Sequence, residues 1–144
     1  MTLINVENVT RIYNAGKPDE VTALHGVSFA VRQGSVAVLK GPSGSGKTSL
    51  LSLVGCMGRP TEGKVVVDGK DIVKLPERFL TEIRRKKFGF IFQQFHLIRE
   101  LTVLENVLLP LYPTSVSGKE MQERAEQTLE KLRMVEKRRL KVKH

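Results

Sequence analysis

The sequence predicts an α/β fold, and features of its first half support that class. Residues 3–13 and 21–32 are predicted to be short strands in a mainly antiparallel arrangement, with a surface loop at 14–19. Residues 36–40 are apolar without alternation, which predicts a buried parallel strand. A glycine-rich loop follows and leads into 49–54, an apolar stretch that is predicted to be helical. Strand, glycine loop and helix in this order predict a phosphate-binding core.

The glycine-rich loop fits G-x-x-x-x-G-K-[ST], a pattern that indicates nucleotide binding only in this context. Glycines let the backbone wrap closely, so that successive N–H groups point at an anion. The helix that begins near Lys47 adds its positive dipole end. Lys47 is expected to reach the terminal phosphates, and the Thr48 hydroxyl to hold a magnesium ion. A plain glycine-rich turn is the alternative. The predicted binding residues here are Gly41, Pro42, Ser43, Gly44, Ser45, Gly46, Lys47, Thr48 and Ser49.

Three further elements are predicted between the loop helix and residue 94. Residues 64–70 are predicted to form a strand that ends in an Asp-Gly turn. Pro76 stands where a first helical residue is expected, and therefore predicts the start of a helix. Residues 88–92 are predicted to form a second buried strand, which ends at the polar pair Gln93 and Gln94.

Two capping-box patterns predict helix starts in the last third of the chain. Thr102 with Glu105 predicts a short helix, and Ser117 with Glu120 predicts a long one. Residues 137–144 are rich in charged side chains and are predicted to be frayed. The long helix carries an apolar stripe at helical spacing, which predicts packing against a neighbour: Met121, Ala125, Leu129 and Leu132.

The composition places limits on the function. The net charge of +9 invites a nucleic-acid interpretation. However, no aromatic residues are interleaved with the basic runs 84–87 and 137–139. A solvated face, or a docking face for a membrane-bound partner, is therefore favoured. No nucleic-acid partner is expected. No apolar run is long enough to span a membrane. The lone Cys56 excludes an intramolecular disulfide, and its apolar neighbours favour a packing role.

Several segments together resemble a known family. Residues 89–98 and 101–107 closely resemble the glutamine loop of ATP-binding-cassette (ABC) transporter ATPases and the segment that follows it. The loop at 41–48, the segment 55–63 and Tyr13 at the end of the first strand are similar to the same family. The chain most resembles the lipoprotein-releasing and macrolide-export branch. Arg99, where the family often has proline, is a departure from the pattern.

The resemblance implies roles for two residues outside the glycine loop. Tyr13 would stack on adenine, a contact worth on the order of 1–3 kcal/mol per base. Because stacking reads little but a ring face, base selectivity is expected to be loose. Gln93 would place its amide oxygen on the magnesium ion and sense the γ-phosphate. The alternatives are an ordinary strand-end aromatic for Tyr13 and a plain polar strand end for Gln93. The implied cofactors are ATP and Mg²⁺.

The resemblance also implies a domain organisation and partners. Residues 1–144 would be a partial nucleotide-binding domain, with a β subdomain and P-loop core portion at 1–94 and the start of a helical subdomain at 95–144. Residues 95–112 would face a membrane permease, and a second ATPase subunit would complete a dimer in the full-length form. The protein would then be cytoplasmic and peripheral on the inner face of the cell membrane.

The family needs motifs that this sequence does not contain. The signature L-S-G-G-Q is absent, as are the second nucleotide motif with its aspartate, the catalytic glutamate and the switch histidine, so no catalytic residue is expected in this chain. Asp68 follows an apolar strand but runs into a hairpin turn, and is not expected to be that aspartate. His25, His96 and His144 all precede the region where a switch histidine belongs.

The resemblance implies a RecA-like core of which this chain would hold only a part, and this predicts an unfinished sheet. By resemblance, later strands would lie between 36–40 and 88–92, so these segments would leave open edges and bare apolar faces. The expected function is the ATPase subunit of an exporter in the full-length form, the chain itself being the N-terminal part and close to inert. A nucleotide-binding fragment without hydrolysis and a stand-alone P-loop kinase are the alternatives.

Overall fold

A computed structural model describes residues 2–142 of the chain. Its contacts divide the chain into two compact units, Met1–Phe88 and Gly89–His144. The first unit contains the sheet and two helices, and the second unit is helical. Each unit has its own buried residues and is described by itself below.

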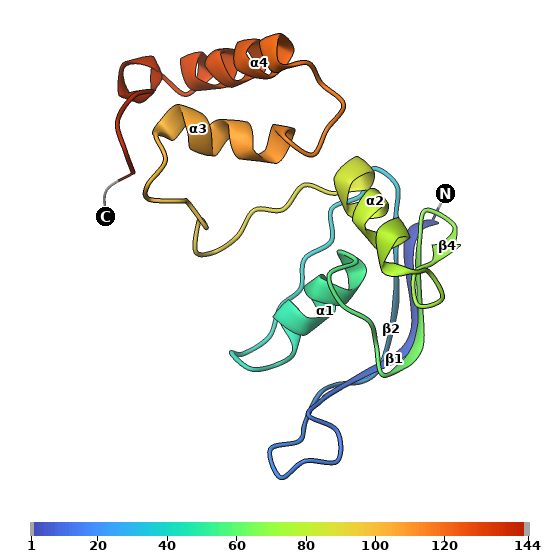
Figure 1. Cartoon of the computed structure of the whole chain (residues 1–144). Helices are drawn as coiled ribbons and strands as arrows, with labels where there is room; N and C mark the ends of the chain where they lie inside the picture. The colour runs from blue at the N-terminus through green and yellow to red at the C-terminus, as the bar shows by residue number, and fades with distance from the viewer. Residues whose placement is uncertain (1, 143–144) are drawn as a thin grey trace. The chain divides into compact units, whose positions relative to one another are not determined.

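The sheet of the first unit has four antiparallel strands in the order β2-β1-β3-β4. β1 (Thr2–Tyr13) and β2 (Val21–Arg32) are long and run side by side in Figure 1. β3 (Glu62–Val67) pairs with the other edge of β1, and the turn at Asp68 and Gly69 leads into the short β4 (Lys70–Asp71). The predicted antiparallel strands and the Asp-Gly hairpin are confirmed.

Two helices pack on this sheet. α1 (Lys47–Val54) begins at the end of the glycine loop, and α2 (Glu77–Lys87) begins directly after Pro76, which is the N-cap residue and not the first helical residue as predicted. The buried core combines side chains from β1, β2, β3 and both helices: Val6, Val9, Leu24, Leu50, Leu53, Cys56, Val65, Val67, Ile72, Leu80 and Ile83. The packing role predicted for Cys56 is therefore confirmed. Burial raises the pKa of its thiol.

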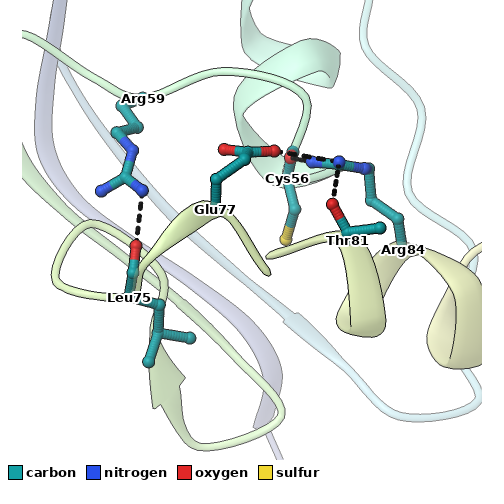
Figure 2. A network of polar contacts seen from close by, with 6 residues as sticks. All are labelled: Cys56, Arg59, Leu75, Glu77, Thr81 and Arg84. Atoms are coloured by element: carbon teal, nitrogen blue, oxygen red, sulfur yellow. Dashed lines mark hydrogen bonds and ion pairs between the residues drawn. The ribbon is translucent and has the colours of Figure 1, made fainter. Parts of the chain in front are cut away.

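Arginine side chains join the end of α1 to α2, as Figure 2 shows. The Arg84 guanidinium donates to the carbonyl of Cys56 at 2.6 Å, to Thr81 and to Glu77. Arg59 donates to the carbonyls of Val73 and Leu75. Because guanidinium has several fixed donors, each arginine satisfies carbonyls that the chain leaves unpaired where it turns. These contacts fix the segment that leads from the glycine-loop helix to α2.

The two predicted buried parallel strands are wrong for this chain. Neither 36–40 nor 88–92 forms a strand in the described part, and Val36 is 92% exposed while Ile91 is fully exposed. A strand needs a neighbour for its backbone N–H and C=O groups. The sheet that the described residues form consists of β1 to β4 alone and offers 36–40 no such neighbour. Both segments expose apolar side chains, as expected for an unfinished sheet.

The second unit consists of short helices. α3 (Val103–Leu108) begins with the predicted capping box of Thr102 and Glu105, and the single-turn helix η1 (Leu109–Leu111) follows. α4 (Gly118–Lys131) begins at Ser117, whose hydroxyl accepts from the Glu120 N–H, and the single-turn helix η2 (Val135–Lys137) comes after it. In Figure 1, α3 and α4 lie side by side.

Two predictions for the second unit need correction. Met121, Ala125 and Leu129 of the predicted stripe are buried, but Leu132 is exposed because α4 ends at Lys131. The segment 137–142 is not frayed, since the carbonyls of Arg138 and Leu140 accept from the first N–H groups of α3 and Lys141 bridges to Thr102. Residues 143 and 144, which include His144, lie outside the described residues.

Candidate nucleotide-binding site

The glycine loop between residue 41 and α1 has a backbone that only glycine adopts readily. Gly44 and Gly46 have φ of 80° and 82°, in the left-handed region. At Gly46 a Cβ atom would come 2.3 Å from the carbonyl oxygen of Ala23 on β2, whereas at Gly44 it would meet nothing within 4 Å. Gly46 therefore allows the loop to pack closely on the sheet, and Gly44 allows the turn itself.

Lys47, the first residue of α1, points back into this loop. Its Nζ donates to the carbonyl oxygens of Gly41 at 2.9 Å and Pro42 at 2.6 Å, and to the Ser45 hydroxyl at 3.3 Å. The eight-residue loop thus encloses its own ammonium group. An ammonium held by carbonyls beside a helix N-terminus is a positive centre for a polyphosphate.

The N-terminus of α1 is open to an anion. Gly46 is its N-cap and supplies no side-chain hydrogen bond, and no acidic residue occupies the first turn. The first N–H groups of a helix lack partners within it, and here no side chain caps them. This end of α1 therefore fits a phosphate group.

Tyr13 lies at the end of β1 and contacts the helix that follows the loop. Its hydroxyl donates to Ser49 Oγ at 3.2 Å, and the Arg11 guanidinium carbon lies 4.6 Å from the centre of its ring. The hydrogen bond to Ser49 and the charge of Arg11 lower the pKa of the Tyr13 phenol against the opposing effect of burial. The ring is 39% exposed. The structure thus brings Tyr13, Ser49 and the glycine loop together in one unit.

The two predicted magnesium ligands fall in different units. Thr48 is exposed beside Lys47 at the start of α1, whereas Gln93 is exposed in the second unit. Among residues 2–142, no three His, Cys, Asp or Glu side chains gather to hold a metal ion. A hydroxyl and an amide oxygen are nevertheless hard oxygen donors, and Mg²⁺ commonly takes only one or two protein ligands beside phosphates. Each of these two groups is therefore, taken by itself, of a kind that can ligate a nucleotide-bound magnesium.

Asn106 is a residue whose role the sequence analysis did not identify. Its side chain is buried, and its amide accepts from the Ile98 N–H at 2.8 Å while donating to the carbonyls of Ile98 and Thr102 at 2.9 Å. It thereby fixes the loop that connects the glutamine segment to α3. The sequence does place this asparagine on a predicted helix, four residues after the N-cap threonine. A polar side chain that is buried at such a position needs hydrogen-bond partners, and this requirement was the available indication of its role.

Other polar residues that could be mistaken for catalytic groups make local contacts. Asp68 lies in the β3–β4 turn and pairs with Lys87 at 2.7 Å, and that lysine lowers the pKa of the Asp68 carboxyl. His96 packs edge-on against the Phe92 ring with centroids 4.6 Å apart. These contacts explain Asp68 as a residue of the β3–β4 turn and His96 as a residue that packs on a neighbouring ring.

The sequence matches a family model with the description ABC transporter over residues 24–144. The lipoprotein-releasing system ATP-binding protein LolD of Cereibacter sphaeroides is 40% identical over 127 residues, which are 88% of this chain and 57% of LolD. The macrolide export ATP-binding/permease protein MacB of Aggregatibacter actinomycetemcomitans is 36% identical over 137 residues, 95% of this chain and 21% of MacB.

A solved structure gives the same result for the fold. This structure is the ATP-binding cassette MJ0796 of Methanocaldococcus jannaschii, a dimer in a post-hydrolysis state bound to ADP and Pi. It matches this chain with a TM-score of 0.84 and 40% identity, over 96% of this chain and 61% of MJ0796. The chain belongs to the ABC transporter family. It spans little more than half the length of the curated ATP-binding proteins that it matches, for example 57% of LolD. The predicted family and its likeness to lipoprotein-releasing and macrolide-export proteins are confirmed.

Proposed function

We propose that this chain binds ATP with magnesium through residues 41–49, as part of the ATP-binding subunit of an ABC exporter. The position of Lys47 carries this proposal. Its ammonium lies within the loop, beside the uncapped N-terminus of α1, so positive charge and free N–H groups converge on one place. Tyr13, tied to Ser49, would stack on the adenine ring.

The magnesium ion would be held by the Thr48 hydroxyl and the Gln93 amide oxygen. When bound, the ion would neutralise part of the negative charge of the nucleotide phosphates. Lys47 would contribute a second positive charge beside them. Gln93 would link the γ-phosphate to the exposed segment that follows it along the chain.

The proposed partner is a membrane permease that docks on residues 95–112. Support comes from the exposed apolar and aromatic side chains of this segment, among them Phe95 (82% exposed), Leu97 and Tyr112. The Asn106 hydrogen bonds would keep the segment in shape for a partner. None of the described helices combines the length and the apolar character needed to cross a bilayer. Attachment to the inner face of the cell membrane would go through the permease.

Hydrolysis is proposed for the full-length form, as a dimer of two ATPase subunits. This sequence contains no L-S-G-G-Q signature and no catalytic glutamate after a second nucleotide motif. A missing general base costs about 10²–10⁴-fold in rate. The 144-residue chain alone would therefore bind ATP without turnover. A nucleotide-binding protein without catalysis is the second candidate, favoured by the unpaired segment 36–40.

The test is nucleotide affinity with a matched pair of lysine variants. ATP binding is measured by titration calorimetry with Mg²⁺ and with a chelator, for the unaltered chain, Lys47→Ala and Lys64→Ala. Lys64 is an exposed lysine on β3 of the same unit, so its removal deletes the same charge elsewhere. Loss of a charge-assisted hydrogen bond worth about 1.5–3 kcal/mol should weaken ATP binding roughly 10- to 150-fold in Lys47→Ala only.

Equal affinities of the three proteins, or affinity that does not depend on magnesium, would contradict the proposed site. Phosphate release, measured on the same samples, should stay at background, because neither candidate function includes turnover by this chain alone. Turnover by this chain would show that a catalytic group has been overlooked. Transfer of phosphate to a small-molecule acceptor would favour the kinase alternative.

A further inference from the structure

One side chain, Arg11, covers a face of the Tyr13 ring. Arg11 and Tyr13 are two residues apart on β1, and their side chains contact each other. The guanidinium carbon is 4.6 Å from the ring centre, within the range of a cation–π contact. An aromatic ring has two faces, and a stacked base needs one of them. With Arg11 in place, a base would have to stack on the opposite face of Tyr13.

Arg11 is itself held in this position. Its NH1 group donates to the carbonyl oxygen of Arg59 at 2.7 Å, and the Arg59 guanidinium in turn donates to the carbonyl of Leu75, the contact drawn in Figure 2. Register shifts in the β1–β2 pairing lie on both sides of Arg11. Such irregularities redirect side chains and are frequent beside functional sites. The guanidinium is therefore fixed by the backbone that follows α1.

Holding Arg11 there has a cost. Among the described residues, its Nε atom is buried and has no hydrogen-bond partner. A buried donor without a partner lowers stability, because it has lost its water. Unpartnered buried groups are rare in folded proteins, and each one needs an explanation. Packing of the sheet alone does not explain the unpartnered Nε atom of Arg11, because a shorter apolar side chain could fill this place without a buried donor.

The far end of the Tyr13 ring is also fixed. Its hydroxyl donates to Ser49 Oγ, one residue after Thr48 in α1. The ring is thus held at its face by Arg11 and at its tip by the helix that begins at the glycine loop. Two such restraints set both the distance and the orientation of the ring relative to the loop.

We propose that Arg11 is a positioning residue for the nucleotide base: it occupies one face of Tyr13 and holds the ring so that adenine stacks on the other. This inference rests on the proposed function. A ring that is ordered before binding loses less side-chain freedom when the base arrives, so base affinity is higher. Removal of Arg11 should therefore weaken the base contact and leave the phosphate contacts intact.

The experiment compares ATP with inorganic tripolyphosphate, which has the phosphates but no base. Magnesium-dependent affinities for both are measured for the unaltered chain, Arg11→Gln and Arg11→Lys. Arg11→Gln should bind ATP roughly 3- to 10-fold more weakly and tripolyphosphate as before, because only the ordering of one side chain is lost. Arg11→Lys keeps a cation over the ring and should restore part of the ATP affinity.

A spectroscopic measurement follows the Tyr13 ring itself. In a Tyr112→Phe background, Tyr13 is the only tyrosine, so ultraviolet titration follows its phenol alone. Since Arg11 helps to lower the pKa of Tyr13, Arg11→Gln should raise it toward the ordinary value. If Arg11→Gln does not fold, Arg11→Lys alone decides: a loss of affinity confined to ATP supports the proposal, and unchanged ATP affinity overturns it.

The outcomes separate this inference from the proposed function. If the unaltered chain binds neither ATP nor tripolyphosphate, the proposed function fails. If it binds both, and Arg11→Gln either keeps full ATP affinity or loses the two ligands equally, only the positioning role of Arg11 is overturned. Unequal loss, with tripolyphosphate spared, supports the role.

Discussion

Two residues of the glycine loop offer a matched test of how closely the loop packs on the sheet. Gly44 and Gly46 have nearly the same φ, 80° and 82°, so alanine at either position is placed in the left-handed region. That conformation costs about 1–2 kcal/mol for a residue with a Cβ. The two positions differ in their surroundings. The new Cβ meets nothing within 4 Å at Gly44, but lies 2.3 Å from the Ala23 carbonyl oxygen at Gly46.

The difference in the free energy of unfolding between Gly46→Ala and Gly44→Ala therefore measures the steric contact with the Ala23 carbonyl. Because Ala23 belongs to β2, backbone must move in Gly46→Ala, and overpacking of this kind costs roughly a further 1–3 kcal/mol. Urea unfolding followed by circular dichroism, without nucleotide, should place the midpoint of Gly46→Ala about 1 M below that of Gly44→Ala for a typical m-value. Coincident midpoints would refute the close approach of the loop to β2.

Three further predictions concern the rest of the chain. Leu129→Ala should lower the free energy of unfolding by about 2–5 kcal/mol, since Leu129 is buried, while Leu132→Ala at an exposed position should leave it almost unchanged in urea melts. Hydrogen bonds from the Thr102 N–H and hydroxyl lower the pKa of Glu105. Their stabilisation is therefore complete above the ordinary carboxyl pKa and is lost as pH falls through the folded-state value. Thr102→Ala removes the hydroxyl but keeps the N–H, so melts across acid pH should show a smaller pH dependence that does not vanish. The amides of 36–39 should exchange with deuterium far faster than those of β1, and equal protection by mass spectrometry would show a strand there.

Local chemistry explains which elements were predictable from the sequence. The capping box at Thr102, the Asp-Gly turn after β3 and the glycine loop before α1 depend on residues close together in the chain, and the structure has all three. The pairing of Tyr13 with Ser49 and the cover by Arg11 depend on contacts between β1 and α1, which no local pattern contains. The sequence therefore predicted the glycine loop and the helix that follows it, but not how Tyr13 is held.

The wrong predictions have a common physical origin. Apolar runs predict buried strands at 36–40 and 88–92, because burial is where such residues are stable. Burial of a strand, however, also requires backbone partners, and these come from other strands that are distant in sequence. α1 and the loop keep their shape without those partners, because Leu50 and Leu53 pack on β1, β2 and β3 and Gly46 lies against Ala23. The glycine loop thus depends on the antiparallel sheet for its support, and for this reason the proposed phosphate binding is expected even where 36–40 remains unpaired.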